Sequence, residues 1–167
     1  MENKTQELVS KLKKQGYEDE WIKLYFIKKF PLENSDAIHE VIQRINQAKF
    51  RKKLIERDSK CIISGSDAIE CEAAHIIPYA ECNQNINSMK KMYERSNGLL
   101  LNLCLHKLFD KYIFSINPWT SEVKVRNGTI NLSICPYNNK IVKIPSECKD
   151  NLIIHYQNFL MLQNRID

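Results

Sequence analysis

Short apolar segments separated by turn signals occupy the centre of the chain and constrain its fold more than any other feature. Between residues 58 and 145 the breaks fall at Gly65, Pro78, Asn97-Gly98, Asn117-Pro118 and Asn127-Gly128. Gly, Pro and Asn-Gly pairs interrupt regular elements and favour turns. This central region therefore predicts short strands and one helix, and helical sequence flanks it on both sides.

The first two segments predict a β-hairpin. Residues 60–65 indicate a short strand that ends at a turn, and residues 70–77 indicate a second strand closed by Pro78. Three further short strands are expected at 113–116, 122–126 and 140–144.

Three helices are predicted around these strands. The first covers 34–57, begins at an Asn-Ser-Asp capping cluster and carries one apolar face, formed by Ile38, Val41, Ile42 and Ile45. The second covers 99–111. The third covers 146–164, with Ser146 as its cap and an apolar packing face, formed by Leu152, Ile153, Tyr156, Phe159 and Leu160.

The composition fits one intracellular domain. The chain has 167 residues, of which 43% are hydrophobic, enough for a real core. Its net charge of +5 is compatible with a polyanionic partner but indicates none by itself. No apolar run is long enough to span a membrane, and the first residues lack the apolar core of a signal peptide. We therefore expect no membrane partner, and a location in the cytoplasm or with DNA.

The six cysteines are expected to be reduced thiols. No two of them stand in the Cys-x-x-Cys spacing of a structural zinc site, although four of them could in principle converge. Buried free thiols are the favoured interpretation.

Two of the four histidines occupy positions suited to catalysis. His75 ends a predicted strand, whereas His106 and Asp110 lie four residues apart and so share one face of a helix. Such a pair can hold a divalent cation or simply hydrogen-bond to each other. A histidine opposite a metal can take a proton from water. Asn97 could bond backbone on both sides and fix the loop that aims His75. His39 and His155 are expected to be structural or exposed.

These residues, in order, resemble the HNH endonuclease family, in the branch with an Ala-His-Ile-x-Pro strand and a His-x-x-Phe-Asp helix. The resemblance spans about residues 50–117. The matching residues are Phe50-Arg51, Arg57-Asp58, Cys61, Ser64-Gly65, Glu72 to Pro78, Asn97-Gly98-Leu99, Leu101 and His106 to Asp110. By resemblance, His75 corresponds to the general base and Asn97 to the catalytic, loop-fixing asparagine. His106 corresponds to the metal ligand, and Asp110 takes the place of a second helical ligand.

The resemblance implies an α+β fold with a ββα-metal (HNH/His-Me finger) core, an N-terminal helical arm and a C-terminal helix. Residues 1–48 form the arm, of unassigned role, and 49–167 the nuclease domain, with its core motif at 58–117. The implied function is a metal-dependent endonuclease that hydrolyses double-stranded DNA. One divalent metal ion is expected, with Mg²⁺ favoured over Mn²⁺, Ni²⁺ or Zn²⁺.

One departure from the family pattern keeps other hypotheses open. Ala74 stands where many members carry an Asp or His that binds metal, and Glu72 and Glu81 are the nearest carboxylates in sequence. The missing ligand supports an alternative, a nucleic-acid-binding module that has lost or weakened its activity. A third hypothesis, a helical interaction protein, rests on the N-terminal residues. A homodimer is a further hypothesis, because double-strand cleavage by a site with one metal needs two active sites or two visits.

Basic residues near the motif are the candidate DNA contacts. Arg51, Lys52 and Arg57 lie on the helix that enters the core, and Lys107 follows His106. Basic side chains of this kind bind phosphates, so they give DNA affinity that depends on salt and little specificity for base sequence. A solvated helix end is the alternative for the three helical residues.

Overall fold

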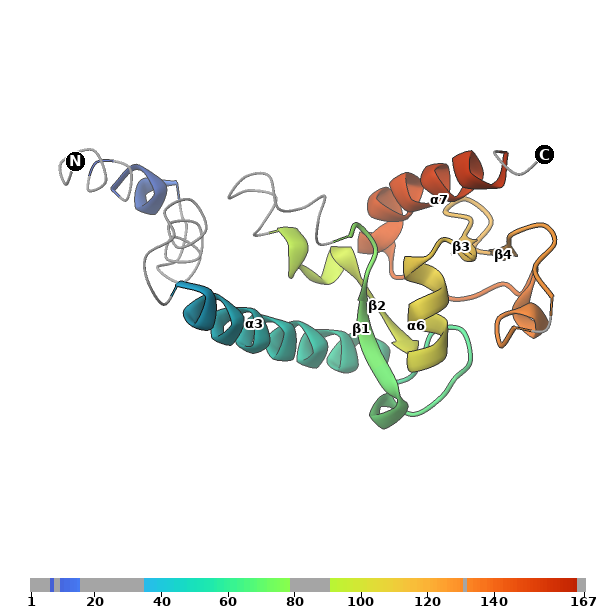
Figure 1. Cartoon of the computed structure of the whole chain (residues 1–167), viewed down its shortest axis with the longest axis horizontal. Coiled ribbons are helices and arrows are strands. Elements are labelled where there is room, and N and C mark those ends of the chain that lie inside the picture. The colour runs from blue at the N-terminus through green and yellow to red at the C-terminus, as the bar shows by residue number, and fades with distance from the viewer. Residues whose placement is uncertain (1–6, 8–9, 16–34, 79–90, 131, 165–167) are drawn as a thin grey trace.

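The computed structural model describes residues 7, 10–15, 35–78, 91–130 and 132–164. Figure 1 shows a long helix, α3, leading to a region of small sheets and helices that ends in α7. The mixed helix and antiparallel sheet content confirms the predicted α+β class. In chain order the elements are α3 (Ser35–Asp58), η1 (Ala68–Glu70), β1 (Cys71–His75), η2 (Arg95–Asn97), β2 (Gly98–Asn102), α6 (Leu103–Asp110), β3 (Phe114–Ile116), β4 (Val123–Val125), η3 (Cys135–Tyr137), η4 (Ser146–Cys148) and α7 (Lys149–Gln163).

Strand β1 pairs with β2 rather than with residues 60–65, so the predicted hairpin is wrong. The two strands are antiparallel, with Cys71 opposite Asn102 and His75 opposite Gly98. Residues 60–65 instead form a compact turn, in which the amide of Gly65 donates to the carbonyl of Cys61. Gly65 has a φ of 77°, which glycine adopts without steric cost and which ends any strand there.

The predicted helix 99–111 is divided between β2 and α6. Its first residues are extended, because Leu99, Leu100 and Leu101 are fully buried in a strand covered on both faces. The helix begins only at Leu103, where the Asn102 side chain accepts a hydrogen bond from the amide of Cys104 at 3.0 Å. A continuous apolar run does not distinguish a buried strand from a buried helix, and the cap decides the boundary.

The C-terminal half of the chain agrees with the sequence more closely. β3 and β4 pair within the predicted ranges 113–116 and 122–126, whereas 140–144 contributes only one bridge, between Glu122 and Ile141. Ser146 lies in η4 without a side-chain cap, so the predicted cap is wrong and α7 begins at Lys149. Leu160 is 37% exposed, because the buried face of α7 follows a spacing of three and four residues, through Leu152, His155, Tyr156 and Phe159.

The apolar face predicted for the first helix is not the face that packs on the sheet. Ile45 is 44% exposed, whereas Asn46, Phe50 and Leu54, each one turn apart, are buried. The side chains of Ile38, Val41 and Ile42 lie outside the described residues, as does Asn34. α3 runs through the predicted boundary at residue 48 without a break.

Gly98 provides space for Phe50 rather than a turn. Its φ of −141° is open to any residue: the chain turns in η2, which ends at Asn97, and Gly98 itself is extended. A Cβ at this position would overlap the Phe50 ring and lie 2.7 Å from Leu54 Cδ1. The absence of a side chain lets α3 pack directly against the start of β2, opposite His75.

The free edge of β2 is closed by the end of α3 and by the turn that follows. The Arg57 guanidinium donates to the carbonyl of Gly98 at 2.8 Å, and the amide of Leu100 donates to Asp58 at 3.3 Å. Further along, the amide of Ile62 donates to the carbonyl of Leu100. An edge satisfied in this way offers no site for pairing with another strand.

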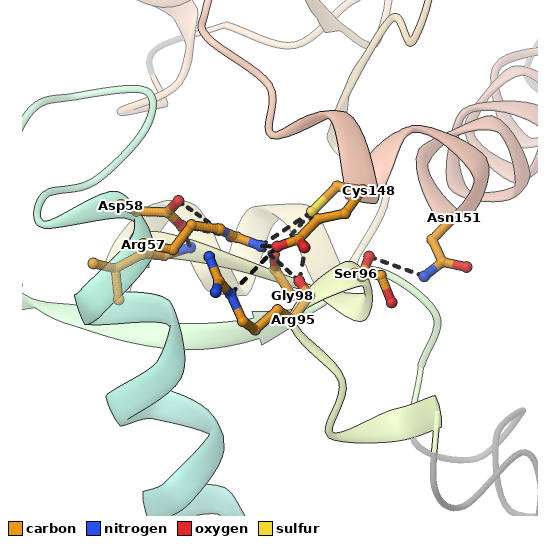
Figure 2. Close-up of polar contacts among 9 residues, drawn as sticks. Arg57, Asp58, Arg95, Ser96, Gly98, Cys148 and Asn151 are labelled. Carbon is orange, nitrogen blue, oxygen red and sulfur yellow. Dashed lines mark hydrogen bonds and ion pairs between the residues drawn. The ribbon is translucent and has the colours of Figure 1, made fainter.

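Arg57 also joins α3 to the C-terminal part of the chain. Figure 2 shows its guanidinium between Asp58, Arg95, Gly98 and Cys148. It binds both oxygens of Asp58 at 2.6 Å and donates to the carbonyl of Arg95 at 2.6 Å and to Glu147 at 3.1 Å. Burial raises the pKa of the neighbouring Cys148 thiol to about 11. The thiol is therefore neutral, and the charge of Arg57 is balanced mainly by Asp58.

We expect Gly98→Ala to destabilise the fold by roughly 1–3 kcal/mol, because the added methyl group forces Phe50 and Leu54 to move. Urea denaturation measures the change. Phe50→Leu shortens the obstructing side chain, so the double variant should lose less stability than the sum of the two single losses. Strictly additive losses would contradict this packing account.

Arg57→Met keeps an apolar stem but removes the charge, and it should cost about 3–5 kcal/mol because Asp58, 3% exposed, is left without its partner. Lys53→Met, at an exposed position of the same helix, is the matched control and should change stability by about 0.5 kcal/mol or less. Equal denaturation midpoints for the two variants would show that the pair is dispensable.

Candidate active site and metal centre

His75 lies at the end of β1 with its ring held by aromatic neighbours. The ring stacks on Phe50 with centroids 4.7 Å apart and meets Tyr93 edge-on at 5.8 Å. Nε2 is buried and has no hydrogen-bond partner among the residues that the structure describes. Burial, and then the charge of His106, lower the pKa of His75 to about 4, although Asp110 opposes the shift. His75 is therefore neutral at pH 7 and able to accept a proton.

Asn97 bonds backbone on both sides, which is the arrangement expected from the sequence. Its Oδ1 accepts from the amide of Ile77 at 2.8 Å, and its Nδ2 donates to the carbonyls of Ile77 and Met92, each at 3.3 Å. Its own carbonyl accepts from the amide of Ile76. Asn97 thus fastens the residues that follow His75 to the start of β2. Its part in catalysis stays a prediction.

His106 lies on α6 between two carboxylates. Its Nδ1 is 2.7 Å from Glu72 Oε2, and its Nε2 is 3.2 Å from Asp110 Oδ2. Burial by itself would lower the pKa of His106, but the hydrogen bonds to Asp110 and Glu72 outweigh it and the pKa is raised. The predicted pair of His106 and Asp110 is therefore in contact, and Glu72 joins it from β1.

The pleat of β1 explains which strand residues reach α6. Alternate side chains of a strand point to opposite faces. Glu72 and Ala74 therefore share the face toward α6, and His75 lies on the other, where Phe50 of α3 stacks on it. Figure 1 shows α3 reaching the sheet from one side and α6 on the other.

The donor atoms at His106 fit a hard divalent cation that keeps most of its water. His106 and Asp110 offer one nitrogen and one carboxylate, and Ala74 offers nothing. Within the described part of the chain, no group of three or more His, Cys, Asp or Glu side chains could hold a metal ion. Mg²⁺ is often held by one or two protein ligands together with water and substrate oxygens. Glu81 lies outside the described residues.

The four predicted DNA contacts divide into two kinds. Lys52 and Lys107 are exposed. Arg51 donates to the carbonyls of Ala68, at 2.7 Å, and Cys71, at 3.1 Å, and so ties α3 to η1 and β1. Arg57 donates its hydrogen bonds inward, to Asp58, Glu147 and the carbonyls of Arg95 and Gly98. The two lysines are accordingly the better placed to meet a phosphate.

Three features of the site go beyond the sequence prediction: the stacking of Phe50 on His75, the internal role of Arg57 and the contact of Glu72 with His106. Only the last had a signal in the sequence. Glu72 stands two residues before Ala74, so any strand at 70–77 puts the two on one face.

The antiparallel strands β1 and β2 and the following helix α6 form a small α+β core that carries His75 on β1 and His106 on α6. Residues 61–117 match the family model described as HNH endonuclease. The chain therefore contains an HNH domain, and the resemblance predicted from His75, Asn97 and His106 is confirmed at the level of the family, though not of the branch. The comparison with curated proteins gave no match. No helix in the described part of the chain is long and apolar enough to cross a membrane.

His155 is also buried, and its contacts are those of a core residue. It is 2% exposed, and its ring stacks on Phe109 and Tyr112. The carbonyl of Phe109, 3.3 Å from Nε2, can only accept, so Nε2 carries the proton and Nδ1 accepts from the Ser115 hydroxyl at 2.8 Å. Burial lowers the pKa of His155 to about 4.

Because the pKa of His155 in the folded protein lies below its usual value of about 6.5, the unfolded chain binds the extra proton between these values. Stability should therefore fall as the pH drops from 6.5 toward 4. In His155→Phe the slope of unfolding free energy against pH should be smaller, by up to about 1.4 kcal/mol per pH unit. Urea denaturation at several pH values measures both slopes, and identical slopes would disprove the assignment.

Proposed function

We propose that the protein is a metal-dependent DNA endonuclease that hydrolyses phosphodiester bonds, with His75 as general base. The observation that carries the proposal is the state of His75: a neutral imidazole whose buried Nε2 has no hydrogen-bond partner in the described part of the chain, in the field of His106 and Asp110. A neutral imidazole can take a proton from the attacking water. The HNH domain supports a nuclease-like function in general.

The chain's own residues would divide the work as follows. Phe50 and Tyr93 hold the ring of His75, and Asn97 holds the loop behind it. His75 accepts the proton of a water molecule at Nε2. His106 and Asp110 would hold one divalent metal ion, with Mg²⁺ the first candidate. When bound, that ion supplies Lewis acidity, which stabilises charge on the phosphate and the leaving oxygen.

Double-stranded DNA is the proposed substrate, and exposed lysines are its proposed contacts. Lys107 directly follows His106, and Lys52 lies on the helix that carries Phe50. Both would bind phosphates, so affinity should fall with salt and depend little on sequence. A homodimer remains part of the proposal, since two active sites would cut both strands in one encounter.

The second candidate function is a nucleic-acid-binding module that has lost or weakened its activity. One observation favours it: Ala74 is fully buried and faces α6, so the strand supplies no metal ligand at that position. Plasmid nicking in the presence of Mg²⁺ or Mn²⁺ distinguishes the two functions directly, because the module would bind DNA without cutting it.

His75→Ala should reduce plasmid nicking by roughly 100- to 10,000-fold, because the general base is removed, while DNA affinity stays close to that of the wild type. His75→Gln keeps more of the packing against Phe50 and guards against a loss that is due only to misfolding. His155→Phe, which removes a buried histidine outside the proposed catalytic and metal-binding set, should still cut at a temperature where it is folded. Full activity of a folded His75 variant would overturn the assignment.

A further inference from the structure

Among the residues that the structure describes, Glu72 is the carboxylate that contacts His106 from outside α6. Its Oε2 lies 2.7 Å from Nδ1, a shorter separation than the 3.2 Å between Asp110 and Nε2. The Glu72 side chain is 49% exposed and that of His106 is 19% exposed. The desolvation free energy of a half-exposed carboxylate in such a contact is small. The hydrogen bond fixes the orientation of the partly covered His106 ring.

The chemistry of the contact decides which nitrogen of His106 is available. An ionised carboxylate only accepts hydrogen bonds, so Nδ1 must carry the proton that Glu72 binds. Nε2 faces the second carboxylate, Asp110, so Nε2 is the nitrogen that would exchange its proton for a cation while Nδ1 keeps donating to Glu72. Histidines that bind metal commonly donate their other ring N–H to a carboxylate, which fixes the tautomer and the ring orientation.

We propose that Glu72 is a positioning residue, which holds His106 in the orientation and tautomer that direct Nε2 toward a divalent cation shared with Asp110. This inference rests on the proposed function, because it assumes that His106 and Asp110 are metal ligands. It also gives the helix-facing side of β1 a role despite Ala74. Ala74 contributes no ligand. Glu72, two residues earlier on the same face of β1, orients the proposed ligand His106.

The test is cation binding by the full chain without DNA. Calorimetric titration with Mn²⁺ should show that Glu72→Ala binds about 10- to 100-fold more weakly than the wild type. Glu72→Gln, whose amide oxygen can still accept from Nδ1, should recover most of the affinity. Glu70→Gln, an exposed carboxylate on the preceding turn, is the matched control and should leave the affinity unchanged.

Co²⁺ absorption separates positioning from direct coordination. If Glu72 positions His106, the visible spectrum of bound Co²⁺ keeps its shape in Glu72→Gln. A changed spectrum, together with a loss in Glu72→Gln as large as in Glu72→Ala, would make Glu72 a ligand and overturn the positioning role. Unchanged Mn²⁺ affinity in folded Glu72→Ala would overturn it as well.

The failure of the underlying proposal looks different. His106→Ala and Asp110→Ala should each lose most of the Mn²⁺ affinity. If the wild type binds neither Mn²⁺ nor Co²⁺, the metal centre itself is refuted, and the role of Glu72 falls with it. If the wild type binds Mn²⁺ and the Glu72 variants bind it with the same affinity, the metal centre stands. The positioning role of Glu72 is then the only part that is wrong.

Discussion

The pairing of Arg57 with Asp58 at the edge of β2 is the interaction on which the rest of the structure depends. Both side chains are nearly buried, and between them they satisfy a carbonyl and an amide of β2. The same guanidinium reaches Arg95 and Glu147, so the long helix, the strand and the start of the C-terminal helix meet at one group. A buried pair of this kind contributes little net stability, but it strongly penalises any arrangement that separates its members.

The position of His75 follows from this junction. With the end of α3 fixed on β2, Phe50 packs where Gly98 leaves room and stacks on the His75 ring. Burial, and then the charge of His106, lower the pKa of His75, whereas the hydrogen bonds to Asp110 and Glu72 raise the pKa of His106. Two histidines of the same intrinsic basicity thus take opposite protonation preferences in one small region of the fold.

Much of the candidate site was predictable because it depends on local spacing. The contact of His106 with Asp110 follows from their separation on a helix, and the bonding of Asn97 follows from the reach of an amide. The partner of β1 was not predictable, because the apolar run at 99–101 suits a buried strand and a helix equally. Arg57 was assigned to DNA on its charge alone, and only the fold shows that its donors are directed inward.

The sequence by itself determined the class of the protein: an α+β chain with an HNH domain, carrying His75, Asn97 and His106 in the family's order. The tertiary structure alone decided the pairing of β1 with β2, the stacking of Phe50 on His75 and the contact of Glu72 with His106. The physical reason is distance along the chain. Spacing within one helix or strand fixes which neighbours share a face, whereas contacts between segments depend on how those faces pack, and Gly98 and Arg57 set that packing here.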